Sequence, residues 1–385
     1  MSLRDVAMIS LRDALESALV ESPDDLATHY AYADYLQEKG DPRGEFIQLQ
    51  LALEDPHRTE SEQRKLRARA DVLQQAFQRE WLGVLADELL GTIEGHMEHW
   101  SLSDRPYEIR FYRGWLDRIV RSAGNNRYSD LARLMCQSPE TRLLRSLVLE
   151  YDEGAMEQLA HSPFLSNLRV FQVGSRFGDA ENLERPFHFI ANFVAKLPRL
   201  EQLYVFTRGG LSYNLFSLSN LTALHTLQIA RLDRQNLLSY LASNPALGNL
   251  AHLWLRSQAA RPSFVDLAGV RAILQSPHLR SLTHLHLHCS DLGDVGCTEI
   301  VTSGILKRLK VLDLRYGEIT DAGARILADS PDLRRLELLD IDHNALSQLG
   351  IDALRRVLGP AFRGDNQQSG EELAQRQYLY EEDFA

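Results

Sequence analysis

The stretch SLTHLHLHCSDL, residues 281–292, decides how the rest of the chain is interpreted. In this stretch Leu285 and Leu287 alternate with three histidines. In an extended strand, alternate side chains point to opposite faces, so the histidines share one face and the leucines the other. Two interpretations follow: the histidines form a metal site, or they occupy one position of a longer repeated pattern.

The leucine pattern around this stretch is repeated along the chain. The frame L-x-x-L-x-L begins at Leu282 and returns at constant spacing at Leu309 and Leu336. Weaker copies begin at Leu144, Leu168, Leu200, Leu224 and Leu250. The intervening segments have helical periodicity, and several are followed by Ser-Pro or Asn-Pro. A helix is expected to end there, because the residue before proline is disfavoured in a helix. Each unit is therefore predicted to be a strand, a turn and a helix, which buries its apolar face only by stacking on its neighbours.

The motif is most complete at LKVLDLRYGEITDAGARIL (309–327) and LELLDIDHNALSQLGIDAL (336–354), where glycine and asparagine positions join the leucines. These segments resemble leucine-rich repeats of the ribonuclease-inhibitor type, most clearly over 282–358 and more loosely back to Leu144. The resemblance implies an α/β solenoid, with a parallel sheet on the concave face and helices on the convex face. It also implies a protein that binds other proteins.

Residues 10–82 lack the repeat and are predicted to be helical. The run YADYLQEKGDPRGEFIQLQLALE (32–54) resembles a small bacterial repeat-companion domain that precedes leucine-rich repeats, a family with no established activity to carry over. Its charged residues Asp34, Asp41, Arg43 and Glu45 have two interpretations. One is an acid/base cluster. The other, which we favour, is a structural turn fixed by hydrogen bonds and an Asp41–Arg43 salt bridge, with Glu45 at a helix N-terminus.

We expect four regions: a helical companion domain, a linker that caps the solenoid, the repeats and an acidic, aromatic tail. Their predicted bounds are 1–90, 91–143, 144–360 and 361–385. Aromatic and β-branched residues around Gly114 predict a hairpin at 107–120, which would close the first repeat. The tail carries Tyr378, Leu379, Tyr380 and Phe384, and either a cap helix, disorder or a docking motif fits it.

The repeat register predicts which side chains lie side by side on the concave face, since equivalent residues of neighbouring strands are lateral neighbours. Aromatic residues and arginine on an exposed face are the types that dominate binding hot spots. We therefore predict a protein or peptide partner at this face. The predicted partner-binding residues are Tyr204, Phe206, Trp254, Arg256, His284, His286, His288, Asp313, Arg315 and Asp340.

A metal site is the main alternative for the histidines. His284 and His286 with His252, and Asp313 within reach, would be a workable zinc set. His288 is the poorest candidate, because it lies between two arginines in its row. A pH-sensitive contact is a further possibility, since imidazoles beside acids titrate near neutrality. We favour the plain binding face and expect no cofactor and no bound metal.

Net charge, apolar runs, cysteine count and motifs argue against several classes of protein. The formal charge of −11, from 53 acidic and 42 basic residues, disfavours nucleic acid. No apolar run is long enough for a membrane helix, and Arg4 and Asp5 stand where a secretory signal would be apolar. The three cysteines are few and odd in number, which fits a reducing, cytoplasmic location. The nucleotide, serine-hydrolase and zinc-protease motifs are missing, so we predict a non-catalytic scaffold. An alternative is that a modifying enzyme acts on the tail.

Overall fold

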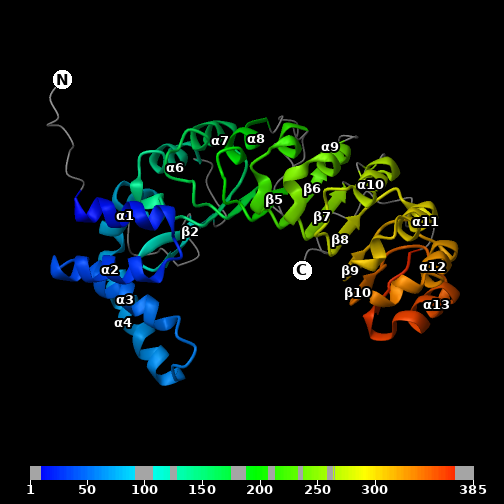
Figure 1. Cartoon of the computed structure of the whole chain (residues 1–385), viewed down its shortest axis with the longest axis horizontal. Helices are drawn as coiled ribbons and strands as arrows, with labels where there is room; N and C mark the ends of the chain where they lie inside the picture. Colours follow the sequence, from blue (N-terminus) through cyan, green and yellow to red (C-terminus); the bar gives the residue numbers. More distant parts are fainter. Residues whose placement is uncertain are drawn as a thin grey trace. The chain divides into compact units, whose positions relative to one another are not determined.

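The structure is a computed structural model that describes residues 10–91, 107–121, 128–174, 188–206, 213–232, 237–257, 263 and 265–368. The chain divides into two compact units, Met1–Val170 and Phe171–Ala385. Figure 1 labels their elements. The four predicted regions are a finer division than these two units, and their bounds stay predictions.

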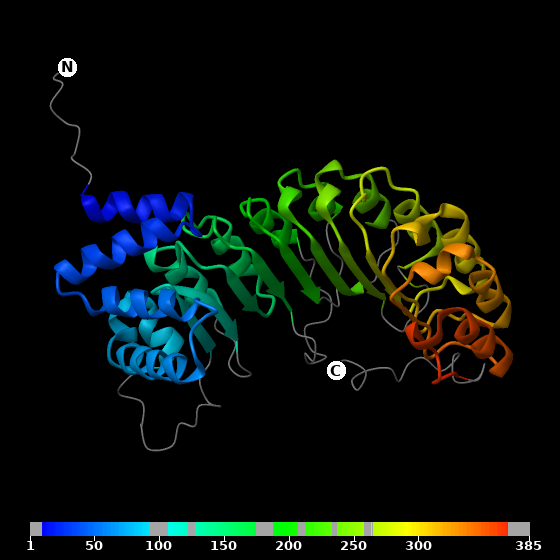
Figure 2. The ribbon, with the colours of Figure 1, turned by 60° about the horizontal axis from the view of Figure 1, so that its bottom comes forward.

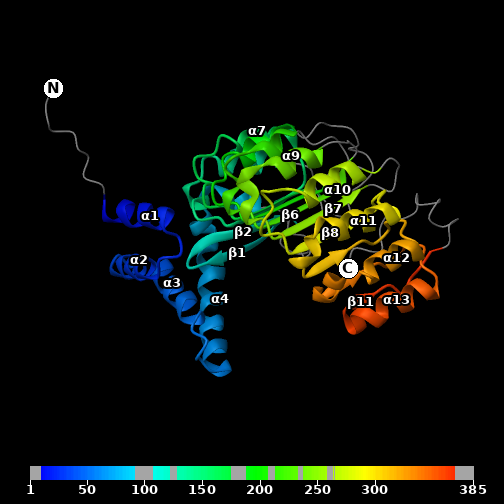
Figure 3. The ribbon, with the colours of Figure 1, turned by 45° about the vertical axis from the view of Figure 1, so that its right-hand side comes forward.

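Helices begin the first unit, as predicted. They are α1 (Leu11–Glu21), α2 (Leu26–Glu38), α3 (Pro42–Leu53), α4 (Glu60–Leu82) and α5 (Ala86–Leu90). In the first four helices, the side chain at the N-cap accepts a hydrogen bond from a free backbone amide, which favours the start of the helix there. The cap residues of α1 to α4 are Ser10, Asp25, Asp41 and Thr59. Figure 3 shows these helices beside the first two strands.

The predicted hairpin is confirmed. Strands β1 (Tyr107–Tyr112) and β2 (Trp115–Arg121) pair antiparallel. Between them Arg113 and Gly114 both have positive φ, 48° and 78°, as a two-residue turn of the type that matches strand twist requires. Strand β2 then pairs in parallel with β3 (Ser146–Leu149), the first repeat strand.

Aromatic rings join the helices and the hairpin in one core. Tyr32 of α2 stacks on Trp115 of β2 with ring centroids 5.6 Å apart. Phe46 of α3 stacks on Trp81 of α4 at 4.8 Å and meets Phe111 of β1 edge-on. Aromatic side chains bury large apolar areas, so these contacts fix the hairpin to the helices.

The second unit consists of repeated strands and helices. Figure 2 shows its strands on one side and its helices on the other. After β4 (Val170–Val173), where the two units meet in sequence, its strands are β5 (Gln202–Phe206), β6 (Thr226–Leu232), β7 (His252–Ser257), β8 (His284–His288), β9 (Val311–Asp313), β10 (Leu338–Asp340) and β11 (Phe362–Arg363). Its helices are α8 (His188–Val194), α9 (Leu237–Ser243), α10 (Leu267–Leu274), α11 (Gly293–Ser303), α12 (Asp321–Ala328) and α13 (Gln348–Leu358), while α6 (Tyr128–Met135) and α7 (Glu153–Leu159) belong to the first unit. From β5 to β11 each strand pairs in parallel with the next.

The leucines of the repeat frame face the interior, as the pattern predicts. Leu285 and Leu287 are fully buried, as are Leu312 and Leu339 at the equivalent position of the next strands. Polar side chains hold the turns that follow. The buried amide of Asn344 accepts from the backbone amides of two residues of the preceding turn and donates to three carbonyls. It therefore satisfies backbone groups that stacking leaves without partners.

The described start of the predicted tail completes the last repeat. Strand β11 pairs with β10, and the backbone amide of Gln368 donates to the carbonyl of Asn344 at 2.7 Å. The tail's aromatic residues lie outside the described part of the chain. In the described part, no helix combines the length and apolar character needed to cross a membrane.

Candidate functional site

The strand register places the predicted face residues side by side. Trp254 of β7 pairs with His286 of β8, which pairs with Asp313 of β9. Asp313 in turn pairs with Asp340 of β10. These residues form one row across the sheet face, from Tyr204 of β5 to Asp340 of β10, as the repeat register predicts. The strand in which leucine and histidine alternate is therefore one strand of the repeat.

Rings stack across β7 and β8. His252 and His284 have centroids 4.0 Å apart and nearly parallel planes. Trp254 and His286 also stack at 4.0 Å. Despite this stacking, Trp254 is 37% exposed, which makes it a large hydrophobic side chain that faces solvent on the sheet side.

Asp313 is the centre of a buried charged cluster. Its Oδ2 lies 3.1 Å from Nδ1 of His286 and 2.7 Å from Nε2 of His288. Arg315 donates to the same oxygen at 3.0 Å, and its backbone amide donates to Oδ1. A second carboxylate, that of Asp340, lies 3.8 Å from Nε of Arg315. Asp313 and Asp340 are both buried, and Arg315 is half-buried.

Burial and hydrogen bonding oppose each other in this cluster. Burial alone would raise the pKa of Asp313, but hydrogen bonds from His286, His288 and Arg315 outweigh it and hold that pKa well below its usual value. Burial lowers the pKa of His286 although Asp313 favours its charged form. Burial and the charge of Asp313 raise the pKa of Asp340. Asp313 is therefore ionised at neutral pH, and His286 is neutral.

The structure differs from three sequence-based expectations about this face. Phe206 is only 5% exposed, because it packs beside Gly174 and pairs with the small side chain of Ala230, so it offers little surface to a partner. His288, ranked poorest for a metal, makes the shortest contact with Asp313. His252 and His284 stack on each other, and His284 shares a hydrogen bond with Thr283. Among the described residues, the group whose ligand atoms converge is His286, His288 and Asp313, all within 4.8 Å of one another.

The remaining predicted residues lie on the sheet face with intermediate exposure. Tyr204 donates its hydroxyl to Oε1 of Gln202 at 2.9 Å. Arg256 pairs in register with His288, the neighbour that the sequence assigned to it. These contacts position the side chains without burying them fully.

The charged motif of the helical region has a structural role. Asp41 caps α3 and accepts from the backbone amide of Arg43, as predicted. The side chain of Arg43, however, is buried over the ring of Trp115 and donates to the carbonyl of Gly114 at 2.8 Å, in place of the predicted salt bridge with Asp41. Glu45 pairs with Arg69 of α4 at 2.6 Å. The motif joins α3 to the hairpin and to α4.

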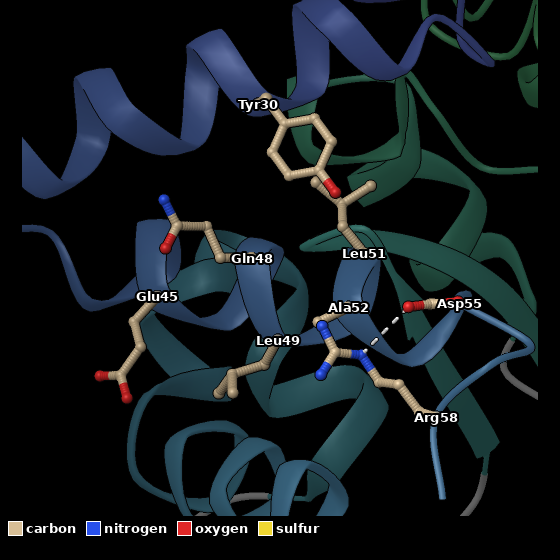
Figure 4. Close-up of a pocket in the computed structure, with 8 residues that line it drawn as sticks. All are labelled: Tyr30, Glu45, Gln48, Leu49, Leu51, Ala52, Asp55 and Arg58. Carbon is tan, nitrogen blue, oxygen red and sulfur yellow. Dashed lines mark ion pairs between the residues drawn. The ribbon is translucent and has the colours of Figure 1, made fainter. Parts of the chain in front are cut away.

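A pocket on α2 and α3, which Figure 4 shows, was not predicted from the sequence. Its volume is about 430 Å³, and it is lined by Tyr30, Glu45, Gln48, Leu49, Leu51, Ala52, Asp55 and Arg58. Tyr30 is 47% exposed, and Asp55 pairs with Arg58 across the pocket rim. The one available signal was a tyrosine on the outer side of α2, which a single sequence does not distinguish from ordinary surface.

Comparisons with known proteins agree with the repeat assignment. Residues 278–301 and 308–328 match the leucine-rich repeat family. A solved protein of Bacteroides fragilis is similar in fold, with a TM-score of 0.51 and 17% identity over 63% of this chain and 73% of that chain. An internalin of Listeria monocytogenes is similar at 17% identity over 65% of this chain and 70% of that chain, with a TM-score of 0.37. No curated relative matches the sequence significantly.

Repeated parallel strands with inward leucines, backed by helices and closed by asparagine-bonded turns, define an α/β repeat solenoid. The family match covers two successive repeats of this solenoid, at 278–301 and 308–328, which are leucine-rich repeats. The preceding companion domain stays a prediction from the motif at 32–54.

Proposed function

We propose that this chain is a non-catalytic scaffold that binds a protein or peptide on the sheet face of its repeats. The observation that carries the proposal is Trp254, a large side chain that is 37% exposed while the leucines beside it are buried. Large apolar groups left in contact with water generally mark an interface. Tryptophan is also among the residues most enriched in binding hot spots.

The cluster next to Trp254 supports the same proposal. His286 stacks on Trp254 and is itself held by Asp313, so the indole is supported by a fixed neighbour. A side chain that is ordered before binding loses less entropy when a partner arrives. The mixed charges of Arg256, Arg315 and Asp340 would supply selectivity around this apolar centre.

The net charge of the chain limits which classes of partner it can bind. A chain with a formal charge of −11 repels nucleic acid and anionic membrane surfaces, which favours a protein or peptide. The sequence has only three cysteines, an odd number that fits reduced thiols, and we propose a reducing, cytoplasmic location on that ground.

Affinity capture from the native cell, with Trp254→Ala beside wild type, tests the proposal. Tyr240→Ala is the matched control, because Tyr240 is an aromatic residue of helix α9 that is 45% exposed. A partner captured by wild type and by Tyr240→Ala should bind Trp254→Ala about 30-fold more weakly, the loss typical of a hot spot. Equal affinity of Trp254→Ala and wild type would place the binding face elsewhere.

A further inference from the structure

We propose that His286, His288 and Asp313 form a binding site for one divalent transition metal ion, best matched to zinc. The proposal is independent of partner binding at the same face. Two histidines at i and i+2 of strand β8 and an aspartate of the neighbouring strand β9 supply two nitrogen ligands and one oxygen ligand. Such a set, with one position open, is typical of zinc sites that exchange a water or a ligand.

The distances fit a shared ion. Zinc bonds of ~2.0–2.1 Å in a tetrahedral arrangement separate neighbouring ligand atoms by about 3.3 Å. The Asp313 oxygen is 3.1 Å from His286 Nδ1 and 2.7 Å from His288 Nε2. The three ligand atoms all lie within 4.8 Å of one another, so side-chain shifts on the order of an ångström would bring them to the separation that one zinc ion requires. Each histidine would bind the ion through the ring nitrogen that faces Asp313, in the tautomer that carries its proton on the other ring nitrogen.

The surroundings hold the ligands in place. The two histidine side chains are 10% and 11% exposed, and that of Asp313 is 5% exposed. The ring of Trp254 lies 4.0 Å from that of His286 and restricts its rotation. Preorganised, desolvated ligands bind metal more tightly than the same groups on a mobile surface.

Arg315 is the competitor for this site. Its guanidinium donates to the same Asp313 oxygen at 3.0 Å and approaches His288 Nε2 at 3.4 Å, so it must move when a cation enters. Asp340 offers it a second carboxylate, already 3.8 Å from its Nε. Metal binding would therefore transfer Arg315 from Asp313 to Asp340. This transfer keeps the buried carboxylates neutralised.

The sequence-based set provides matched controls. His252 and His284 lie on the same face, one row away from the cluster, and stack on each other. The structure gives them no part in the proposed site. Their replacement should leave metal binding unchanged, although it removes the same kind of side chain.

Calorimetric titration of metal-free full-length protein with zinc chloride tests the site. Wild type, His252→Ala and His284→Ala should bind one equivalent with equal affinity. His286→Ala and His288→Ala should bind at least ~100-fold more weakly, since loss of a ligand costs more than loss of its support. Arg315→Gln should bind more tightly than wild type, because it removes the competing cation.

Tryptophan fluorescence gives a second readout. Titration with copper(II), a quencher, should reduce the emission of wild type, and the quenched fraction should be missing in Trp254→Phe. Circular dichroism of each variant checks that it is folded. Absence of equimolar zinc binding by wild type, undiminished binding by folded His286→Ala and His288→Ala, or its loss in His284→Ala would each overturn the proposal.

Discussion

Asp313 shows how one residue can organise a surface. It is buried beneath a face that is otherwise open to a partner, and it accepts from two histidines and an arginine. A buried carboxylate is costly unless donors surround it, and the donors are then fixed by the same bonds. The positions of His286, His288 and Arg315 thus depend on one side chain.

Asp313→Asn should lower the free energy of unfolding by ~2–4 kcal/mol, because it leaves buried donors without a charged acceptor. Urea unfolding at pH 7 measures the change. Glu337→Gln is the control, since its ion pair with Lys310 is exposed at both ends and should contribute at most ~0.5 kcal/mol. Equal effects of the two substitutions would mean that the cluster is not the stabilising network described above.

His286 should make the protein sensitive to acid. Its pKa is lowered in the folded state by burial, so the unfolded chain binds a proton at higher pH than the folded chain. Stability is therefore lost as the pH falls below about 6.5 and through the folded value. In the presence of a chelator, wild type should lose more stability between pH 7 and 5 than His286→Asn, which has no imidazole there. Parallel pH curves would contradict this.

At the scale of the element, the turn after β10 is bonded to the turn after β9. Asn344 is fully buried and bonds to backbone groups of its own turn and of the preceding one. Gly317 stands at the equivalent position of the preceding repeat and has no side chain to do this. One amide therefore holds two turns.

Asn344→Ala should lower the free energy of unfolding by ~2–4 kcal/mol, since several buried backbone groups lose their partner. Asn249→Ala is the comparison, because Asn249 makes an exposed bond to the carbonyl of Thr222 and should cost less than ~1 kcal/mol. Thermal or urea unfolding measures both. If Asn344→Ala is as mild as its comparison, the turns do not depend on this amide.

The hairpin turn depends on glycine. Gly114 has a φ of 78°, and a Cβ there would lie 2.3 Å from Cγ1 of Ile47 in α3. Gly114→Ala should cost at least ~2 kcal/mol, from backbone strain and from the collision with Ile47. Gly248→Ala is the control, because a Cβ at Gly248 meets nothing within 4 Å and should change stability by less than ~0.5 kcal/mol. Unfolding curves with the same shift for both would argue against close packing of the hairpin on α3.

How much the sequence reveals differs between elements and side chains. Leucine spacing predicted the strands, their register and the inward leucines, because a period of two and a constant repeat leave one consistent alignment. The strand register predicts which residues are lateral neighbours, but it does not determine the rotamers of their side chains. For that reason it missed the reach of His288 to Asp313 and the burial of Phe206 beside Gly174. The pairing of Arg43 with the carbonyl of Gly114 joins segments far apart in sequence, which no local pattern reveals.

At the scale of the whole molecule, the two units differ in what their charged and aromatic residues contact. The first unit ties its helices to a hairpin through Tyr32, Trp115 and Arg43, and its charged motif is used in that packing. The second unit presents a face of stacked rings and buried charges between β5 and β10. We propose that recognition belongs to the second unit.

The most direct test of this proposal is hydroxyl-radical footprinting of the protein with and without its captured partner. Oxidation of Trp254 should fall sharply when partner is saturating, because binding at the sheet face covers the indole, while oxidation of Tyr240 on helix α9 stays the same. Unchanged oxidation of Trp254 together with protection of Tyr240 would contradict the account.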